Sequence, residues 1–383
     1  MKTRFQLVAA VTLLSSIIPQ PSALLAQGSL TPPGAPAPTM KTLQQVEPRV
    51  PISSAPFTIS QPGSYYLTTN LTVSGGDAIT IATSGVTLDL NGFTISSTTN
   101  PASGTAVLIN DGLRDITIQN GHIRGGVTNN GSGTFSGPGF GDGISFSGAA
   151  PRNVRLNGVS VSGCRYSGIN VGLGESSTVE NCVVQTVGGY GIAANTIRGC
   201  VTLDCGGTAI YGQQVSDSRG ESAGGNGLSA GTAQNCYGSS SSSGGTGLSA
   251  QTAQNCYGVS SSGYGLFANL NAIGCSGSST SGTGLYAYTA QNCCGFSSSG
   301  TGLYAYTAQN CCGFSTSGTG LYAWSTAIGC YGQSSSGLRG LYAQNAAFCI
   351  GSRIGGRAIE ANIANGCWAS GGTNLITYKY NMP

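Results

Sequence analysis

The sequence predicts an all-β fold, a right-handed parallel β-helix of roughly 16 coils with a period of 18 to 20 residues. Short runs alternate apolar and polar residues, several residue types recur with a fixed period, and no helical periodicity is present. The recurring column of cysteine, with Ser218 in one place, consists of Cys164, Cys182, Cys200, Cys236, Cys256, Cys275, Cys293, Cys311, Cys330, Cys349 and Cys367. A column of leucine or isoleucine runs in phase with it: Leu228, Leu248, Leu266, Leu285, Leu303, Leu321, Leu341 and Ile359. A glycine follows most cysteines by two residues, at Gly238, Gly258, Gly277, Gly295, Gly313, Gly332 and Gly351.

The first coils show the period of two that is typical of strands. Val86, Leu88 and Leu90 alternate with polar residues, and the turn residues Asn91 and Gly92 follow them. No single coil can bury its own apolar side chains, so stacking is expected to place like residues about 4.8 Å apart. The sequence therefore predicts strands from residue 57 onward.

Tight corners are expected at two sets of positions, because Gly and Asn tolerate a positive φ. One set is the glycine column, and the other is the Asn or Gly that precedes most cysteines, such as Asn292 before Cys293. A left-handed β-helix would need an aliphatic residue at every sixth position, but Gln291 and Ser297 stand six and twelve residues after Leu285. The right-handed form is therefore predicted.

Three segments are expected along the chain. Residues 1–26 resemble a secretory signal, with basic Lys2 and Arg4, a short apolar run and small residues up to Ala26. An uncleaved anchor is the alternative for this segment. Residues 27–55 form a Pro-rich leader and possible N-terminal cap, in which residues 40–46 could form a helical turn. Residues 56–383 form the β-helix, with regular repeats from about 160 to 370. The predicted location is extracellular, at the outer surface or in the periplasm.

Charge is sparse, at 7% of residues. Removing Lys2 and Arg4 from the 15 basic residues leaves 13 against 12 acidic ones. No cluster of Lys and Arg exists, so nucleic acid is not an expected partner. No Cys-x-x-Cys pair or suitable His partner is present, and neither a metal nor another cofactor is expected.

Three early segments carry a family resemblance. They are the run from Gly63 to Leu71 (GSYYLTTNL), the run from Gly85 to Ile95 (GVTLDLNGFTI), and the run from Asp115 to Gly125 (DITIQNGHIRG). They resemble the opening coils of right-handed β-helix proteins of the pectin-lyase-like superfamily. The arrangement from Gln27–Gly34 (QGSLTPPG) to Tyr378–Pro383 (YKYNMP), nearly the entire chain, resembles a Verrucomicrobia-type group of secreted bacterial β-helix proteins. The resemblance implies the fold and leaves the activity open, because this superfamily includes lyases, hydrolases, epimerases, adhesins and non-catalytic scaffolds.

The catalytic patterns of polysaccharide-active β-helices are missing. No Asp-Asp dipeptide occurs, and the single histidine, His122, lies outside a Gly-His-Gly motif. The weak candidates for lyase-like chemistry are Asp89, Asp115, His122, Arg124 and Arg155, which fall on early coils. Isolated outward charges of this kind are usually only solvated. A Gly-rich stretch, 125–143, is expected as an outward loop within two coils, either a binding loop or a flexible insertion.

An outward aromatic stripe is expected in the later coils. Alternation places Leu285 and Ala287 inward and the tyrosines between and after them outward. The stripe comprises Phe267, Tyr286, Tyr288, Tyr304, Tyr306, Tyr322, Trp324 and Tyr342. Flat exposed rings can stack on sugars, whereas the plainer alternative is that they only stabilise adjacent strands.

Most cysteines are expected to be inward thiols held by packing. Cys294 and Cys312 follow inward cysteines and replace tyrosines of earlier copies, so they are expected to face outward on adjacent coils as the favoured disulfide. The sequence predicts a secreted, non-catalytic structural or surface-interaction β-helix with polysaccharide or cell-envelope glycan as its candidate partner. The alternative is a polysaccharide lyase or hydrolase acting from the early coils. An ice- or mineral-binding face is a third reading, for which the Ser and Thr rows are irregular.

Overall fold

The computed structural model describes residues 48–174 and 176–382, and Arg49–Pro383 forms one compact unit. The expected signal segment 1–26 and the helical turn at 40–46 lie outside the described residues. The first strand, β1 (Val50–Ile52), pairs in parallel with β3 (Gly63–Leu67). The solenoid thus begins inside the segment 27–55 that was expected to be a leader, because Val50 and Ile52 can already join the parallel ladder.

The strands of the first coils and of the loop are β2 (Phe57–Ile59), β4 (Leu71–Val73), β5 (Ile79–Ile81), β6 (Val86–Asp89), β7 (Thr94–Ser97), β8 (Thr105–Ile109), β9 (Arg114–Arg124), β10 (Thr128–Asn129), β11 (Phe135–Ser136), β12 (Asp142–Phe146) and β13 (Arg152–Cys164). The strands of the middle coils are β14 (Ile169–Gly172), β15 (Thr178–Glu180), β16 (Val183–Val187), β17 (Ile192–Arg198), β18 (Val201–Cys205), β19 (Ile210–Ser216) and β20 (Arg219–Ser222).

From residue 228 onward, most coils contribute one longer and one short strand. The longer strands are β21 (Leu228–Gln234), β23 (Leu248–Gln254), β25 (Leu266–Ile273), β27 (Leu285–Gln291), β29 (Leu303–Gln309), β31 (Leu321–Ile328), β33 (Arg339–Ala347), β35 (Arg357–Asn365) and β37 (Thr373–Tyr380). The short strands are β22 (Tyr237–Ser240), β24 (Tyr257–Ser260), β26 (Ser276–Ser279), β28 (Cys294–Ser297), β30 (Cys312–Ser315), β32 (Tyr331–Ser334), β34 (Ile350–Arg353) and β36 (Trp368–Ser370).

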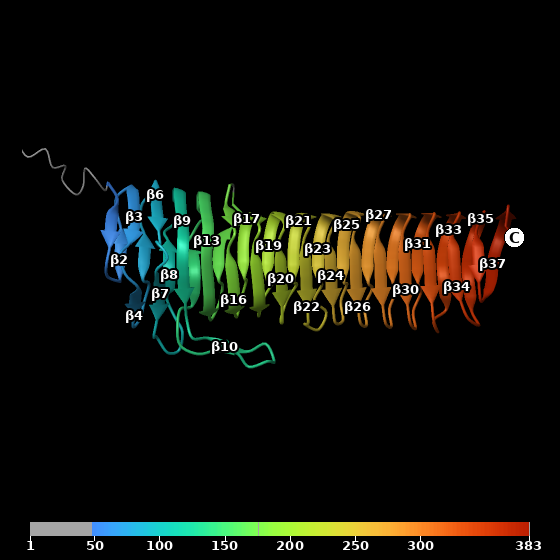
Figure 1. Ribbon diagram of the computed structural model, residues 1–383, viewed down its shortest axis with the longest axis horizontal. Coiled ribbons are helices and arrows are strands. Elements are labelled where there is room, and N and C mark those ends of the chain that lie inside the picture. The colour runs from blue at the N-terminus through green and yellow to red at the C-terminus, as the bar shows by residue number, and fades with distance from the viewer. Residues whose placement is uncertain (1–47, 175, 383) are drawn as a thin grey trace, which may run out of the picture. The chain divides into compact units, whose positions relative to one another are not determined.

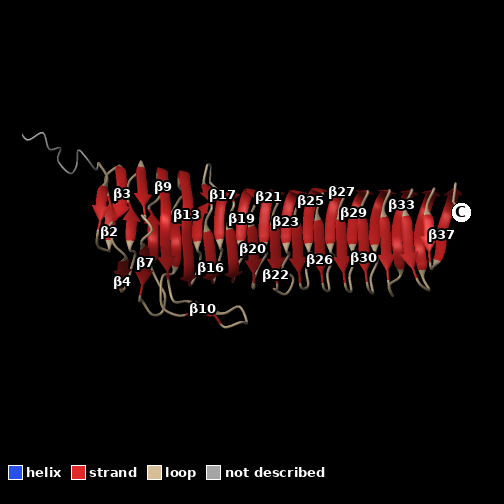
Figure 2. Ribbon diagram, viewed as in Figure 1, coloured by secondary structure: helices blue, strands red, loops and turns tan. Residues whose placement is uncertain are grey.

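The predicted parallel β-helix is confirmed. The strands stack coil upon coil into a solenoid of about 17 turns (Figure 1). The described residues contain strands and loops but no helix (Figure 2), and so none of their elements is an apolar helix able to cross a membrane. Longer strands pair with longer strands, with Leu285 opposite Leu303, and short strands pair with short strands, with Gly295 opposite Gly313. The repeated columns of the sequence are therefore columns in space.

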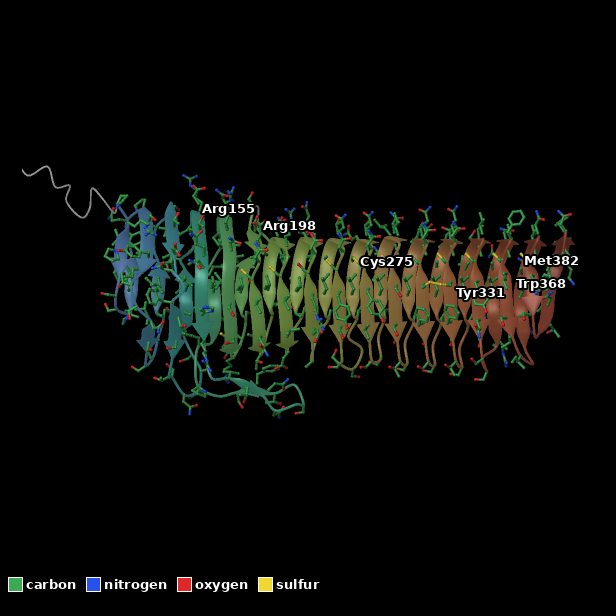
Figure 3. All side chains as sticks on the ribbon, viewed as in Figure 1. Arg155, Arg198, Cys275, Tyr331, Trp368 and Met382 are labelled. Carbon is green, nitrogen blue, oxygen red and sulfur yellow. A yellow bond between two sulfur atoms is a disulfide. The ribbon has the colours of Figure 1, made fainter. Side chains whose placement is uncertain are left out.

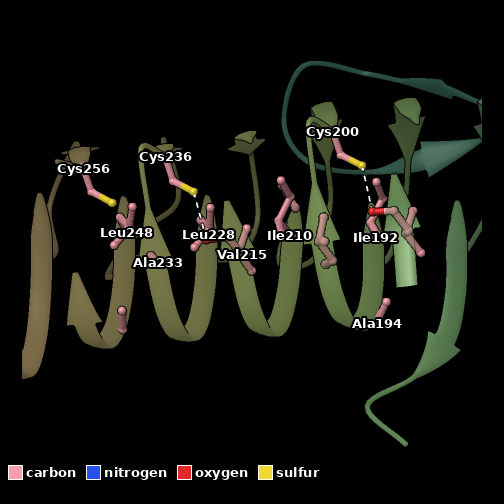
Figure 4. Close-up of a cluster of buried hydrophobic side chains, with 14 of the residues drawn as sticks. Ile192, Ala194, Cys200, Ile210, Val215, Leu228, Ala233, Cys236, Leu248 and Cys256 are labelled. Carbon is pink, nitrogen blue, oxygen red and sulfur yellow. Dashed lines mark hydrogen bonds between the residues drawn. The ribbon is translucent and has the colours of Figure 1, made fainter. Parts of the chain in front are cut away.

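The core is narrow and consists mainly of small side chains. Leu285, Ala287, Ala290 and Cys293 of one coil are buried, and the equivalent residues of neighbouring coils stack on them. Leucine and cysteine columns lie inside the coils in Figure 4, as the alternation predicted. Cysteine packs here as a small apolar side chain, and the thiol of Cys293 also donates a hydrogen bond to the carbonyl of Ala272 at 3.3 Å.

The residues that precede the cysteines have the positive φ that was expected of tight corners. Asn292 and Asn310 have φ values of 55° and 52°, and Gly274 has a φ of 61° in the same place. A Cβ at Gly274 would approach the Oδ1 of Asn255 in the preceding coil to 2.7 Å, a contact that the Asn255 side chain can relieve by moving. Phe348 departs from the pattern, since it takes this corner with a φ of 54°.

The expectation that the glycine column forms corners is wrong. Gly295 is buried within strand β28 and does not have a positive φ. A Cβ on Gly295 would lie 2.1 Å from the carbonyl oxygen of Gly302 across the same coil. Glycine is required here because the two sides of the thin coil come into backbone contact.

A column of buried serines joins successive coils. These serines are the last residues of the short strands, at the end away from the Asn and Gly corners. Its members are Ser222, Ser240, Ser260, Ser279, Ser297, Ser315 and Ser334. Each hydroxyl donates to a glycine carbonyl of the preceding coil, as from Ser315 to Gly300 at 2.7 Å. The serines of the repeat are therefore structural as well as turn-forming.

The middle of the Gly-rich stretch 125–143 forms a loop outside the coils, visible beneath β9 and β13 in Figure 1, whereas Phe140 is buried in the core and Asp142 and Gly143 belong to β12. The loop strands β10 and β11 pair as an antiparallel hairpin. The amide of Asn129 donates to the carboxylate of Asp204 at 2.6 Å, which fastens the loop to a coil far along the chain.

Candidate functional site

Two columns of aromatic rings lie on the same outward face of the later coils. The first runs along β25, β27, β29, β31 and β33, and its members are Phe267, Tyr286, Tyr304, Tyr322 and Tyr342. Successive rings are stacked, with centroids 5.0, 5.1, 4.9 and 4.5 Å apart. The parallel register sets this repeat, because equivalent positions of paired strands lie side by side.

The second column contains Tyr288, Tyr306 and Trp324, two residues further along the same strands. Tyr288 and Tyr306 are stacked with centroids 4.8 Å apart and an interplanar angle of 2°. These rings are the more exposed ones, with 53% of Tyr288, 40% of Tyr306 and 48% of Trp324 accessible. The two columns border a shallow groove of about 320 Å³ whose lining includes Ala287. We call it the aromatic groove, lined by Tyr286, Ala287, Tyr288, Tyr304, Tyr306 and Trp324.

Stacking decides what the rings offer a ligand. Tyr304 has a stacked neighbour on each face, so its edge and hydroxyl are what remain available. Burial, together with the neighbouring tyrosines, raises the pKa of Tyr304 and of Tyr322 above the ordinary value of 10.0, so these phenols stay neutral donors and acceptors. The groove is therefore an uncharged surface of ring edges and hydroxyls, opening on the exposed rings of the second column.

The first column ends at a charged cluster. Glu360 occupies the position next to Tyr342, and its carboxylate accepts hydrogen bonds from Arg339 at 2.5 Å and Arg357 at 2.8 Å. Burial alone would raise the pKa of Glu360, but the two guanidinium groups outweigh it and lower that pKa. Arg339 also lies over the ring of Tyr342, 5.0 Å from its centroid, and so closes the stack.

The weak catalytic candidates occupy different parts of the early coils. Asp89 lies at the end of β6 beside Gln119, and Arg155 lies beside Thr117. Asp89 already accepts a hydrogen bond from the backbone N–H of Asn91 at 2.8 Å. It also forms an ion pair with Arg49 at 3.7 Å.

The other three candidates all belong to β9, Asp115 near its start and His122 and Arg124 after its bend. Asp115 stands at a corner with a φ of 60° and accepts a hydrogen bond from Asn153 at 2.6 Å. His122 and Arg124 follow the bend at Asn120 and pair with β7 instead of β6. Among residues 48–174 and 176–382, no three side chains of His, Cys, Asp or Glu gather in a way that could hold a metal. The five catalytic candidates thus lie on different strands and corners, and they do not come together as one acid–base site.

Sequence reasoning missed a second aromatic pair on a different face. Phe296 and Phe314, on β28 and β30, are stacked with centroids 5.1 Å apart and an interplanar angle of 5°. Tyr331 lies against Phe314 at 5.5 Å. The available signal was the alternation of Phe296 with the buried Gly295 and Ser297, which places the ring outward.

The cysteines divide as the alternation suggested. Cys294 and Cys312 lie opposite each other on β28 and β30 and form a disulfide, while the other twelve cysteines are buried and free. Figure 3 shows sulfur along the coils, with Cys275 of the buried column labelled. Burial, with the nearby Asp142, raises the pKa of Cys164 to about 12. The Cys164 thiol is therefore a poor nucleophile at neutral pH.

The fold and the face together define a parallel β-helix protein with an outward aromatic groove. No protein-family model matches the chain, and no curated protein matches it. Three solved structures are similar to it in part. The A-module of the mannuronan C-5 epimerase AlgE6 of Azotobacter vinelandii is 14% identical, with a TM-score of 0.29, and the match covers 84% of this chain and 91% of that one.

The other two are more distant in identity. ORF18 of Geobacillus virus E2 is 12% identical, with a TM-score of 0.22 and coverage of 84% of this chain and 53% of that one. The surface protein and adhesin PfbA of Streptococcus pneumoniae is 10% identical, with a TM-score of 0.23 and coverage of 87% and 89%. These values are too low to support an argument about the activity of this chain.

Proposed function

We propose that this protein is a non-catalytic β-helix of the cell exterior or cell envelope that contacts glycans through the aromatic groove. The observation that carries the proposal is the pair of parallel aromatic columns, in which Tyr288, Tyr306 and Trp324 remain about half exposed. Aromatic rings present a large apolar surface, and those of Tyr and Trp also carry a polar group. A sugar ring, with apolar C–H faces and a rim of hydroxyls, is complementary to such a surface.

The repeat of the groove favours a polymer over a single small molecule. Tyr286 and Tyr304 occur at equivalent positions of successive coils, and Tyr288 and Tyr306 stack in the same way, so the same contact is offered again at the next coil. A chain of repeated sugar units could engage several of these contacts at once, which raises its overall affinity. The groove is shallow and open, which suits an extended chain lying along the surface.

The external location is part of the proposal and rests on the sequence. Lys2, Arg4 and the apolar run that follows them have the form of a secretory signal, and the rest of the chain carries 13 basic and 12 acidic residues out of the 15 and 12 in the whole sequence. Detection of the chain, shortened by the signal segment, outside the cytoplasm of its host would support the location. Finding the full-length chain only in the cytoplasm would contradict it.

The glycan proposal is tested by affinity gel electrophoresis of the mature chain. The probes are hydroxyethyl cellulose, xyloglucan and galactomannan as neutral polysaccharides, with alginate and polygalacturonate as acidic ones. Each ring is expected to contribute on the order of 1 kcal/mol, so the triple variant Tyr288→Ala, Tyr306→Ala, Trp324→Ala should bind a responsive glycan at least tenfold more weakly. Tyr378→Ala, an exposed aromatic on β37, is the matched control.

Two outcomes would overturn the proposal. One is the absence of retardation by all five polysaccharides, and the other is unchanged retardation of the triple variant. The same five probes are assayed for depolymerisation, and none is expected. Chain cleavage that is lost in Asp89→Asn or Arg155→Ala would instead favour the lyase or hydrolase alternative.

A further inference from the structure

The pair Phe296 and Phe314 forms the centre of a second groove, on a different face from the aromatic groove. This second groove encloses about 270 Å³, and its lining includes Ser278, Phe296, Ser298, Phe314, Thr316 and Gln333. The two rings belong to the short strands β28 and β30, whereas the aromatic groove belongs to the longer strands β27, β29 and β31. The corners at Asn292 and Asn310 separate the two sets of strands.

One ring in this second groove has an uncovered face. Phe314 is covered by Phe296 on one side and approached by Tyr331 on the other. Phe296 has Phe314 on one face only, because its neighbour in the preceding coil is Ser278, whose side chain is too small to cover a ring. Phe296 is accordingly 40% exposed, and the groove includes this open side.

The polar part of the lining defines the class of ligand. The exposed residues Ser298 and Thr316 lie beside the rings at equivalent positions of successive coils, and the amide of Gln333 follows Phe314 in the same row. Hydroxyl and amide groups both donate and accept hydrogen bonds, as sugar hydroxyls do. The lining contains no charged residue, so nothing in it compensates a carboxylate or a sulfate.

The spacing of the two rings is held by covalent structure. The disulfide between Cys294 and Cys312 joins β28 to β30 two residues before Phe296 and Phe314, with the two Cα atoms 4.6 Å apart. A site whose rings are fixed before binding loses less conformational freedom when the ligand arrives.

We propose that the Phe296–Phe314 groove is a second binding site, specific for neutral polysaccharide, in which a sugar ring stacks on the open face of Phe296. It acts separately from the aromatic groove, so that the solenoid is bivalent and can hold two glycan chains on two faces of the same coils. The proposal goes beyond the first site and does not require it, because no residue is shared between the two linings.

The experiment uses the full mature chain and the same gels, with hydroxyethyl cellulose, xyloglucan and galactomannan as the neutral probes. Four proteins are compared: the parent, Phe296→Ala with Phe314→Ala, the triple variant of the aromatic groove, and the combination of all five substitutions. The triple variant should retain measurable retardation by at least one neutral probe, and adding the two Phe substitutions should weaken it about tenfold or more. Alginate and polygalacturonate should show no contribution from the Phe pair.

The outcomes separate the two sites. Complete loss of binding in the triple variant would overturn the second site and leave the first intact, as would residual binding that is insensitive to the Phe substitutions. Residual binding to the acidic probes alone would overturn the neutral specificity. If the Phe substitutions abolish all binding while the triple variant behaves as the parent, the second groove is the glycan site and the aromatic groove is not. Far-ultraviolet circular dichroism and hydrogen exchange verify that each variant is folded.

Discussion

Ser297 donates a hydrogen bond from its hydroxyl to the carbonyl oxygen of Gly282 in the preceding coil, at 2.7 Å. The same hydroxyl accepts the backbone N–H of Gly300 at 2.8 Å, so one buried atom satisfies two backbone groups. The bond recurs from coil to coil along the serine column. It joins neighbouring coils at the end of the short strands, where backbone bonds such as that from Ser298 to Ser279 also link the coils.

Replacing Ser297 with Ala should loosen this corner. Both the carbonyl of Gly282 and the amide of Gly300 would lose a partner, and an unsatisfied buried polar group costs about 1–3 kcal/mol. Hydrogen exchange of the segment containing Gly300 should accelerate by roughly fivefold to a hundredfold. Ser298→Ala, one residue further and exposed, is the control and should leave exchange unchanged. Equal exchange in both variants would show that the corner is held by other contacts.

Gly295→Ala should be far more damaging than an ordinary Gly-to-Ala change. The new Cβ would stand 2.1 Å from the carbonyl oxygen of Gly302, so the backbone of the coil must move. Overpacking of this kind costs about 1–3 kcal/mol or more. Gly75→Ala is the matched control, because the nearest atom to its new Cβ is 4.0 Å away. Thermal unfolding followed by circular dichroism should separate the two, and similar melting curves would contradict the close approach.

Thiol counting tests the division of the cysteines. The denatured, unreduced chain should react with 12 equivalents of a thiol reagent, which is the 14 cysteines of the sequence minus the two in the disulfide. The native chain should react with almost none, because the column is buried. Mass mapping should then find a single linked pair, Cys294 with Cys312. Extensive cross-linking along the column from Cys236 to Cys367 would refute packing as free thiols.

Removing the disulfide should be tolerated but measurable. The bond closes a loop with a sequence separation of 18, for which loss of chain entropy in the unfolded state predicts a contribution of about 3 kcal/mol. The double variant Cys294→Ser, Cys312→Ser should therefore unfold at lower urea concentration than the parent. The parent treated with reductant should match it. A double variant as stable as the oxidised parent would show that the strand ladder alone holds β28 to β30.

The tyrosine stack should make stability depend on alkaline pH. The pKa values of Tyr304 and Tyr322 are raised in the folded chain above 10.0, so the unfolded chain ionises first. Their contribution is then complete below the unfolded pKa and is lost as pH rises through the folded pKa. Stability in urea should be level through neutral pH and fall above about pH 10. The variant Tyr304→Phe, Tyr322→Phe should fall less steeply, and an identical decline would contradict the shift.

Much of the fold follows from the sequence because a solenoid repeats its packing at each coil. The columns that contain Leu285 and Cys293 predict burial, and the asparagine at 292 predicts a left-handed corner, and all three are found. The glycine at 295 was misread, because a glycine in a repeat signals either a turn or close backbone contact, and spacing alone does not distinguish them. The close approach of the two sides of the coil, which the structure shows, identifies Gly295 as a position of backbone contact.

The candidate sites were predictable only in part. The outward direction of Tyr286 and Tyr288 follows from strict alternation within one strand. Ser297 was missed because it opens the run Ser297–Gly300 (SSSG), which looks like a turn, and its partner Gly282 lies in another coil. Phe296 was missed because the repeat around it occurs only twice, with Ser278 and Gln333 in the flanking coils. Contacts between coils depend on register, which the order of residues alone does not specify at the corners.

The near-identity of successive coils has a consequence for how this surface can change. Deleting residues 303–320 would join Gly302 directly to Leu321 and leave every remaining column in phase, since Leu285 would then take Leu321 as its neighbour. Each coil contacts mainly its two neighbours, so the other coils should keep their packing, but the deletion also removes Cys312 and with it the disulfide to Cys294. Duplication of one such unit would lengthen both grooves by a step of about 4.8 Å, whereas this deletion would shorten the aromatic groove and remove Phe314 from the second groove. The length of each groove is thus set by the number of repeats, which recombination between repeats can change without any new point mutation.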